Sequence, residues 1–147
     1  MDLILWRHAE AEDGIMRDAE RKLTAKGVKQ ADRMAKWLRE RIAADAVVLV
    51  SPAKRAQQTA HALNADFKTE PAIGLAARAE DVLRAAGWPN GEGTVVIVGH
   101  QPTLGEAAAM ALTGAKRDWT VKKGALIWIT RRDNTVQLRA AISPDLL

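Results

Sequence analysis

The sequence contains no cysteine and few aromatic residues, and each absence excludes a class of protein. Without cysteine there is no disulfide framework, no thiolate nucleophile and no cysteine-ligated zinc site. The aromatic residues are five tryptophans and one phenylalanine, which lie mostly within apolar runs, and the basic residues are spread along the chain. Nucleic-acid-binding surfaces gather basic and aromatic side chains together, so we expect no nucleic acid as a partner.

Long apolar runs are also missing. No stretch of the sequence has the length that a membrane-spanning helix requires, so we expect no association with a membrane. The charged residues Arg7, Glu10 and Glu12 follow the first apolar run too soon for a secretory signal peptide. Together with the absence of cysteine, this pattern predicts a cytoplasmic protein.

The composition is that of a globular protein. Apolar residues make up 48% of the 147 positions and charged residues 27%, which allows a substantial core. The sequence has no repeat, linker or low-complexity tract, so we predict one domain over residues 1–147. The net charge of +4 permits nucleic-acid binding, and it equally suits a phosphorylated substrate.

Short apolar runs alternate with amphipathic patterns along the chain. Runs that are apolar at every position are typical of strands buried on both faces. The predicted strands are 3–6, 46–50, 67–70 and 94–98, followed by a hairpin of 125–130 and 136–141 joined through 131–134. The predicted helices are one from the N-cap Thr24 to about residue 42, then 53–63, 80–86 and 103–112. This order favours a three-layer α/β/α sandwich whose central sheet is mostly parallel, with an antiparallel edge at the C-terminus.

Polar side chains follow three of these strands at the point where each strand ends. Arg7 and His8 follow the first strand, Ser51 the second and His100 the third. The carboxyl ends of parallel strands meet at one edge of a sheet, which is where ligands bind in open α/β sheets. Arg55 lies one helical turn beyond Ser51, so we expect it at the same edge.

Two histidines and two arginines at one edge indicate phosphoryl transfer. A guanidinium group matches the oxygens of a phosphate, and a neutral imidazole is a nucleophile toward phosphorus. Adjacent guanidinium groups oppose protonation of His8, which keeps its ring nitrogen available for attack. These residues favour a phosphohistidine intermediate that positive charge stabilises, and we expect neither a metal ion nor another cofactor.

The same residues fall within motifs of a known family. Residues 5–10, Leu-Trp-Arg-His-Ala-Glu, resemble the first signature of the histidine phosphatase superfamily, whose members are phosphoglycerate mutase-like. Residues 51–60 resemble its second motif, S-x-x-x-R-A-x-x-T-A, and residues 99–102 resemble its third, which contains H-x-P. The motif D-x-x-R-x-L-T-x-x-G of the short SixA-type branch, which comprises phosphohistidine phosphatases, is matched by Asp18, Arg21, Leu23, Thr24 and Gly27.

The resemblance implies a role for each motif residue. His8 is then the nucleophile that accepts the phosphoryl group, while Arg7 and Arg55 hold its oxygens. His100 completes the pocket and bonds the transferring group, and Arg21 contacts the phosphate or the substrate from its loop. The resemblance also implies a phosphoglycerate mutase-like fold and a hydrolase that acts on phosphomonoesters or phosphoramidates.

One feature departs from the superfamily pattern. Longer members supply a carboxylic acid between the second and third motifs, which protonates the leaving group. Small and apolar residues occupy that region here, and Glu70, Glu80 and Asp81 are candidates by position alone. A donor at neutral pH needs a raised pKa. Without one, alkyl phosphate esters are poor substrates, whereas phosphoramidates such as phosphohistidine tolerate the loss better.

Three functions are compatible with these observations. The first is a metal-independent phosphatase that removes phosphate from phosphohistidine in a signalling protein, with a histidine phosphotransfer domain as the candidate partner. The second is a phosphatase of a small phosphorylated metabolite, which the basic residues between 116 and 123 would also suit. The third is a binder of phosphorylated ligands without catalysis, which the presence of all four site residues disfavours.

Overall fold

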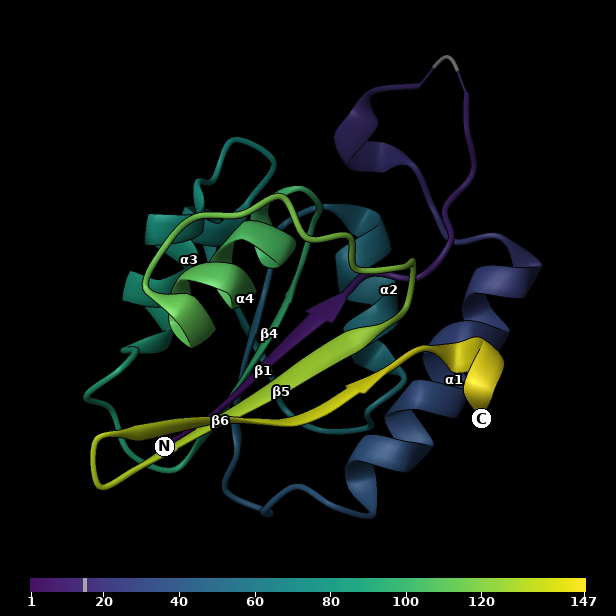
Figure 1. Ribbon diagram of the computed structural model, residues 1–147. Coiled ribbons are helices and arrows are strands. Elements are labelled where there is room, and N and C mark those ends of the chain that lie inside the picture. The colour runs from purple at the N-terminus through teal and green to yellow at the C-terminus, as the bar shows by residue number, and fades with distance from the viewer. Residues whose placement is uncertain (15) are drawn as a thin grey trace.

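A mixed six-stranded sheet lies between two helical layers in the computed structural model, which describes residues 1–14 and 16–147 (Figure 1). The strands are β1 (Asp2–Arg7), β2 (Val47–Val50), β3 (Lys68–Thr69), β4 (Thr94–Gly99), β5 (Leu126–Arg132) and β6 (Thr135–Ile142). The α-helices are α1 (Ala25–Arg39), α2 (Lys54–His61), α3 (Ala79–Ala86) and α4 (Thr103–Thr113). Short 3-10 helices form η1 (Asp18–Glu20), η2 (Pro71–Ile73) and η3 (Pro144–Leu146).

The strand order confirms the predicted fold. The sheet runs β3-β2-β4-β1-β5-β6. The first four strands in this order are parallel, and β5 and β6 are antiparallel to their neighbours. Helices α1 and α2 cover one face and α3 and α4 the other (Figure 1). The antiparallel edge therefore comes from the C-terminal hairpin, as the sequence indicates.

Strand β1 lies near the middle of the sheet, and its side chains alternate between the two helical layers. Leu3 and Leu5 pack with residues of α3 and α4, whereas Ile4 and Trp6 pack with residues of α1 and α2. All four side chains are fully buried. A run that is apolar at every position is thus explained by burial on both faces, and the chain surfaces only at Arg7.

Helix α1 begins where the sequence predicts. The Thr24 side chain accepts a hydrogen bond from the backbone N–H of Gly27, at 2.9 Å, which caps the helix. Gly27 is required for a second reason, because a Cβ atom there would collide with the backbone oxygen of Glu10. The helix therefore packs closely on the chain that leaves β1, which fixes the loop after His8.

The hairpin turn is shorter than predicted. Strands β5 and β6 pair as far as Arg132 and Thr135, so Asp133 and Asn134 alone form the turn. Both have positive φ, 50° and 64°, as a two-residue turn of type I′ requires. Asn and Asp tolerate this conformation, which lets the strands extend into the predicted loop. Within the described residues, none of the helices has the length and hydropathy of a membrane span.

Candidate active site

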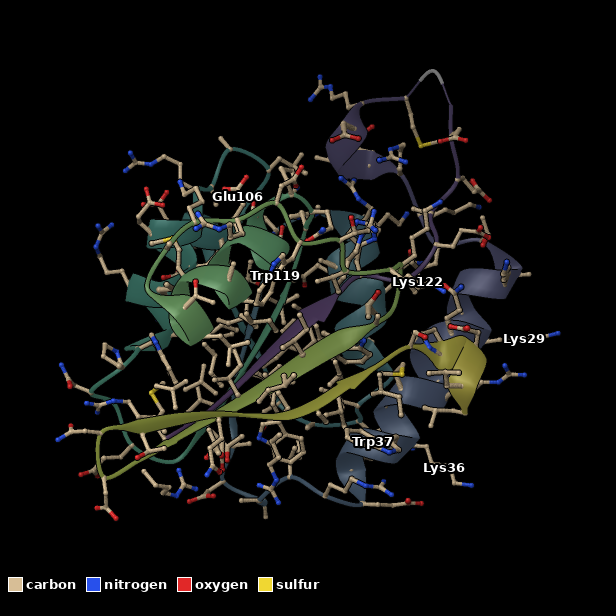
Figure 2. The ribbon with its side chains drawn as sticks, in the orientation of Figure 1. Lys29, Lys36, Trp37, Glu106, Trp119 and Lys122 are labelled. Carbon is tan, nitrogen blue, oxygen red and sulfur yellow. The ribbon has the colours of Figure 1, made fainter. Side chains whose placement is uncertain are left out.

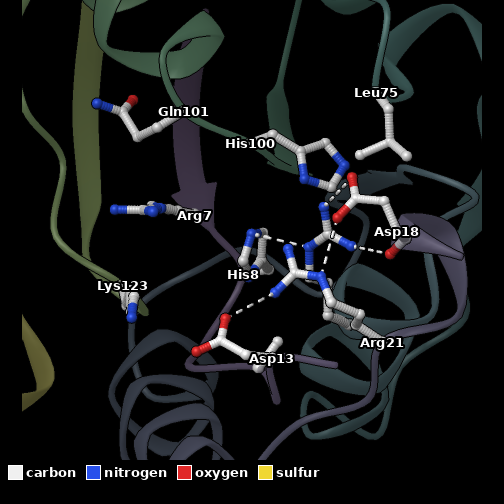
Figure 3. Close-up of a pocket in the computed structure, with 11 residues that line it drawn as sticks. Arg7, His8, Asp13, Asp18, Arg21, Leu75, His100, Gln101 and Lys123 are labelled. Atoms are coloured by element: carbon white, nitrogen blue, oxygen red, sulfur yellow. Dashed lines mark hydrogen bonds and ion pairs between the residues drawn. The ribbon is translucent and has the colours of Figure 1, made fainter. Parts of the chain in front are cut away.

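The three predicted strand ends meet at one edge of the sheet. The backbone N–H of His8 donates to the carbonyl of Gly99 at 3.0 Å, and that of Ser51 donates to Val98 at 3.0 Å. A cavity of about 400 Å³ opens at this edge. Its walls include all five residues proposed for the site: Arg7, His8, Arg21, Arg55 and His100 (Figure 3).

His8 is held in one tautomer. Its Nδ1 lies 2.7 Å from the carbonyl oxygen of Ala9. A carbonyl only accepts hydrogen bonds, so Nδ1 carries the proton. Its Nε2 lies 3.2 Å from Nε of Arg55, which only donates, so Nε2 carries a lone pair. The nitrogen that faces the arginines is thus the one that can attack phosphorus.

Both histidines at the cavity are held in the neutral form. Burial, reinforced by the nearby charges, lowers the pKa of His8 to about 3 and that of His100 to about 4. The sequence predicts that neighbouring guanidinium groups keep His8 neutral, but these groups are only part of the cause of its lowered pKa. Burial has the largest effect on its pKa, and the positive charges of Arg55 and Arg7 lower it further.

These pKa shifts predict acid behaviour that differs from that of ordinary histidines. An unfolded histidine takes up a proton near pH 6.5, whereas His8 and His100 remain neutral when folded until about pH 3 and 4. Their contribution to stability is therefore complete above pH 6.5 and is lost as the pH falls toward 4. We expect their Cε1–H NMR signals to keep neutral shifts between pH 7 and 5, and His8→Ala to reduce the loss of thermal stability over the same range. A His8 titration centred near pH 6.5 would contradict this prediction.

Arg55 is the most constrained cation of the site. It is 3% exposed although it belongs to α2. Besides its contact with His8, its guanidinium group donates to the backbone oxygen of Asp18 at 2.6 Å and to the Asp18 carboxylate at 3.3 Å. Asp18 also accepts from Nε of Arg21 at 2.9 Å. The carboxylate thus joins two arginines, and the pKa of Asp18 is lowered chiefly by its hydrogen bond with Arg21.

Arg7 lies on the other side of His8 (Figure 3). One terminal nitrogen donates to the carbonyl of Val121 at 2.8 Å, while its buried Nε has no partner among the described residues. Burial lowers the pKa of Arg7, and the charge of Arg55 lowers it further. Arg7 thus brings a guanidinium group that can bond phosphoryl oxygens to the wall of the cavity that contains His8.

The loop between α4 and β5 brings a further cation that the sequence did not single out for the cavity. Lys123 lines the cavity beside Arg7 (Figure 3). Its loop is fastened to the end of β1, because Trp6 Nε1 donates to the carbonyl of Gly124 at 2.9 Å and the N–H of Gly124 donates to His8 at 3.0 Å. The basic composition of residues 116–123 is the only sequence signal that could have indicated this role.

His100 is oriented by Ser51. Its Nε2 lies 2.7 Å from the Ser51 hydroxyl, which also accepts from the N–H of Ala53 at 3.2 Å. Its Nδ1 is buried and has no partner among the described residues. The His100 and His8 rings are tilted at 57°, with centroids 5.2 Å apart. The His100 ring therefore lies at the cavity close enough to His8 to contact a group held there.

Thr59 shows a role that the sequence pattern concealed. It is the threonine of the second motif, and it is fully buried. Its hydroxyl nevertheless accepts from the N–H of Ala9 at 3.0 Å and donates to the carbonyl of Arg55 at 2.7 Å. Thr59 thereby links the chain after His8 to the helical turn that carries Arg55.

The three carboxylic acids considered as proton donors do not line the cavity. Glu80 binds Lys116 at 2.8 Å, and Asp81 caps α3 and pairs with Arg84 at 3.1 Å. The pKa of Glu80 is lowered mainly by its hydrogen bond with Lys116, and that of Asp81 by its hydrogen bond with the backbone of Arg78. Glu70 precedes η2, outside the cavity walls. Of these candidates by position, Glu80 and Asp81 are unsuited to donate a proton at neutral pH, because nearby cations and N–H groups stabilise their ionised forms.

Comparisons with known proteins agree with this site. A sequence model of the histidine phosphatase superfamily (branch 1) matches residues 3–74. A phosphohistidine phosphatase SixA homolog from Haemophilus influenzae is 33% identical over 124 residues, which cover 74% of this chain and 76% of that protein.

Solved structures share the fold over almost the whole chain. The structure of a protein histidine phosphatase SixA complexed with tungstate superposes with a TM-score of 0.84, at 23% identity and 99% coverage of both chains. A phosphoserine phosphatase from Entamoeba histolytica gives a TM-score of 0.74, at 16% identity, with 99% of this chain and 98% of that chain covered. The motif residues meet in one cavity, and the relatives match this chain in sequence or in fold. The chain therefore belongs to the histidine phosphatase superfamily, in its SixA-type branch, and this membership supports phosphatase activity.

Proposed function

We propose that the protein is a phosphohistidine phosphatase that acts on a phosphorylated protein. The observation that carries this proposal is a cavity that has a nucleophile and several cations but no built proton donor. Two carboxylates line the cavity among the described residues, Asp13 and Asp18. The Asp13 side chain is fully exposed, and Asp18 is held ionised between two arginines. An alkoxide leaving group would therefore depart without an acid, which disfavours alkyl esters.

A phosphorylated imidazole needs no acid at the leaving atom, because its other ring nitrogen can hold a proton. His8 Nε2 attacks the phosphorus while the N–P bond of the substrate breaks, and the substrate imidazole leaves as a neutral ring. Phosphorylated His8 is likewise a phosphorylated imidazole with a proton on its other nitrogen. Its Nδ1–H donates a hydrogen bond to the carbonyl oxygen of Ala9. Water then attacks its phosphorus, and inorganic phosphate leaves with both protons of that water while His8 becomes neutral again.

The surroundings of the cavity support a protein-borne substrate. Its rim includes Asp13 and Leu75, both exposed to solvent, so the mouth lies at the surface. The related protein from Haemophilus influenzae is named a phosphohistidine phosphatase homolog, which supports the same substrate class. A histidine phosphotransfer domain is the partner we propose, because it presents one phosphorylated imidazole on an exposed helix.

The test is a comparison of substrates by their kcat/KM. We expect a phosphohistidine peptide to be turned over at least about 10²-fold faster than a phosphoserine peptide, since a general acid contributes about that much when an alkoxide leaves. Phosphoramidate, an aryl phosphate and a sugar phosphate complete the series. A sugar phosphate ranked first would overturn the proposal in favour of a metabolite phosphatase. The phosphoserine peptide ranked first would overturn the phosphohistidine specificity, and a phosphoserine phosphatase does share this fold.

A further inference from the structure

A basic groove extends from the active-site cavity along α1. The cavity shares Arg7 and Lys123 with a second hollow of about 430 Å³. That hollow shares Lys26 and Gln30 with a third, which continues along the helix to Arg33. We call the second and third hollows together the α1 groove. It is continuous with the site where His8 acts, so a molecule bound at His8 can extend into it.

The charge of the α1 groove is mostly uncompensated. Six cationic side chains and two carboxylates line it. Among the described residues its only ion pair joins Lys122 to Asp145 at 3.9 Å, and Glu10 is engaged by the Thr24 hydroxyl at 2.8 Å. Lys116, by contrast, pairs with Glu80 at 2.8 Å. The groove therefore presents a positive potential to whatever enters it.

These cations do not serve the stability of α1. Lys26 lies in the first turn, which contains no acidic residue. The positive end of the helix dipole disfavours a cation there. Lys26, Lys29 and Arg33 follow one another at helical spacing, where like charges repel. A face that weakens its own helix is better explained by a ligand than by folding.

The shape of the face favours a polypeptide over a small anion. Lys26, Lys29 and Arg33 are exposed, and Lys36 follows them at helical spacing. Lys29 and Lys36 point away from the helix into solvent, so their charges do not converge on one point (Figure 2). Positions 26 to 33 span about 10 Å of helix axis, with a charge at each turn. Carboxylates at successive turns of an acidic helix match this row.

We propose that the α1 groove binds an acidic segment of the phosphorylated protein while its phosphohistidine occupies the cavity. This inference rests on the proposed function for its substrate. A second copy of this chain is disfavoured as occupant, because the net charge is +4 and the same cations would face each other. Single-stranded nucleic acid is disfavoured, because none of the described residues that line the groove is aromatic and could stack on a base.

The test uses Lys26→Glu/Lys29→Glu/Arg33→Glu, three positions outside the cavity walls. The control is Lys68→Glu/Arg84→Glu/Arg117→Glu, which changes the net charge equally at exposed sites away from the groove. The probes are two phosphohistidine peptides of equal length, one with glutamates one helical turn apart and one with glutamines instead. We expect the wild type to have about tenfold lower KM for the acidic peptide at low salt. The groove variant should lose this preference, the control variant should keep it, and both should turn over phosphoramidate as the wild type does.

The neutral peptide and a binding measurement separate the two proposals. Turnover of the neutral peptide tests the proposed function alone, whereas binding of the unphosphorylated acidic peptide, followed by fluorescence anisotropy, tests the groove without catalysis. Equal effects of the groove and control variants on that binding would overturn the inference. Tighter binding of a DNA oligomer of equal charge, lost only in the groove variant, would also overturn it by assigning the groove to nucleic acid.

Discussion

His8→Ala is expected to lower kcat by about 10⁴-fold or more, because loss of a nucleophile removes the covalent route and not merely one contact. Only Nε2 of this ring combines a free lone pair with a place among the arginines. The folded protein should persist. The ring makes its Nδ1 hydrogen bond within its own local chain, and we expect Tm to change by less than about 5 °C.

His61→Ala is the matched control for this variant. His61 is exposed on α2, packs edge-on against Phe67 with ring centroids 5.1 Å apart, and lies outside the cavity walls. Its loss should leave kcat unchanged. A phosphoenzyme trapped from the wild type should be labile in acid and stable in base, as a phosphoramidate is, and should be absent from His8→Ala. Wild-type turnover in His8→Ala would reject His8 as the nucleophile.

Arg55→Ala is expected to lower kcat/KM by about 10³-fold, the upper range for loss of one charge-stabilising donor. Arg55→Lys should still lose about 10²-fold, since a lysine retains the charge but not the planar fork that meets two oxygens. The guanidinium of Arg55 directly contacts the nucleophile at 3.2 Å. It is also nearly inaccessible to solvent, so water cannot replace its hydrogen bonds to a phosphoryl group.

Asp18→Ala distinguishes the contact of Arg55 with His8 from its contact with Asp18. If Arg55 served only to anchor the loop through Asp18, both alanine variants would lose the same activity. We expect Arg55→Ala to lose at least about tenfold more than Asp18→Ala, because a phosphoryl oxygen bonds the arginine itself. Lys54→Ala, at the adjacent exposed position of α2, should behave as the wild type. The activities of Arg55→Ala, Asp18→Ala and Lys54→Ala are compared by steady-state kinetics with phosphoramidate as the substrate.

The elements of this fold could be predicted from local patterns. Apolar runs located β1, β2 and β4, and Thr24 marked the start of α1. Because these strands are parallel, the residues that follow them had to share one edge, and the cavity contains the predicted arginines and histidines. The parallel direction of these strands thus determines which residues meet, and it could be predicted from the alternation of apolar runs and helical patterns in the sequence.

The remaining features depend on contacts between distant segments. Lys123 reaches the cavity because its loop crosses α4 closely at Gly105, where a Cβ atom would collide with the backbone oxygen of Trp119. Nothing in the local sequence of either segment indicates this crossing. Burial likewise governs the pKa of His8, and burial is a property of the whole packed structure. The hydroxyl of Thr59 was hidden for the same reason, since its partners are apart in sequence.

The pairing of β1 with β4 has a consequence for how the length of this chain can change. Arg7 lies opposite Gly99, and the same ladder places Leu5 opposite Ile97. Loss of one residue within β1 would exchange its two buried faces and also move His8 away from Gly99. The loop that joins β1 to α1 is different, because Asp13 borders the cavity from a fully exposed position. Insertions there are expected to reshape the mouth while both histidines keep their places, so the mouth of this cavity can change without any change in the pairing of the strands.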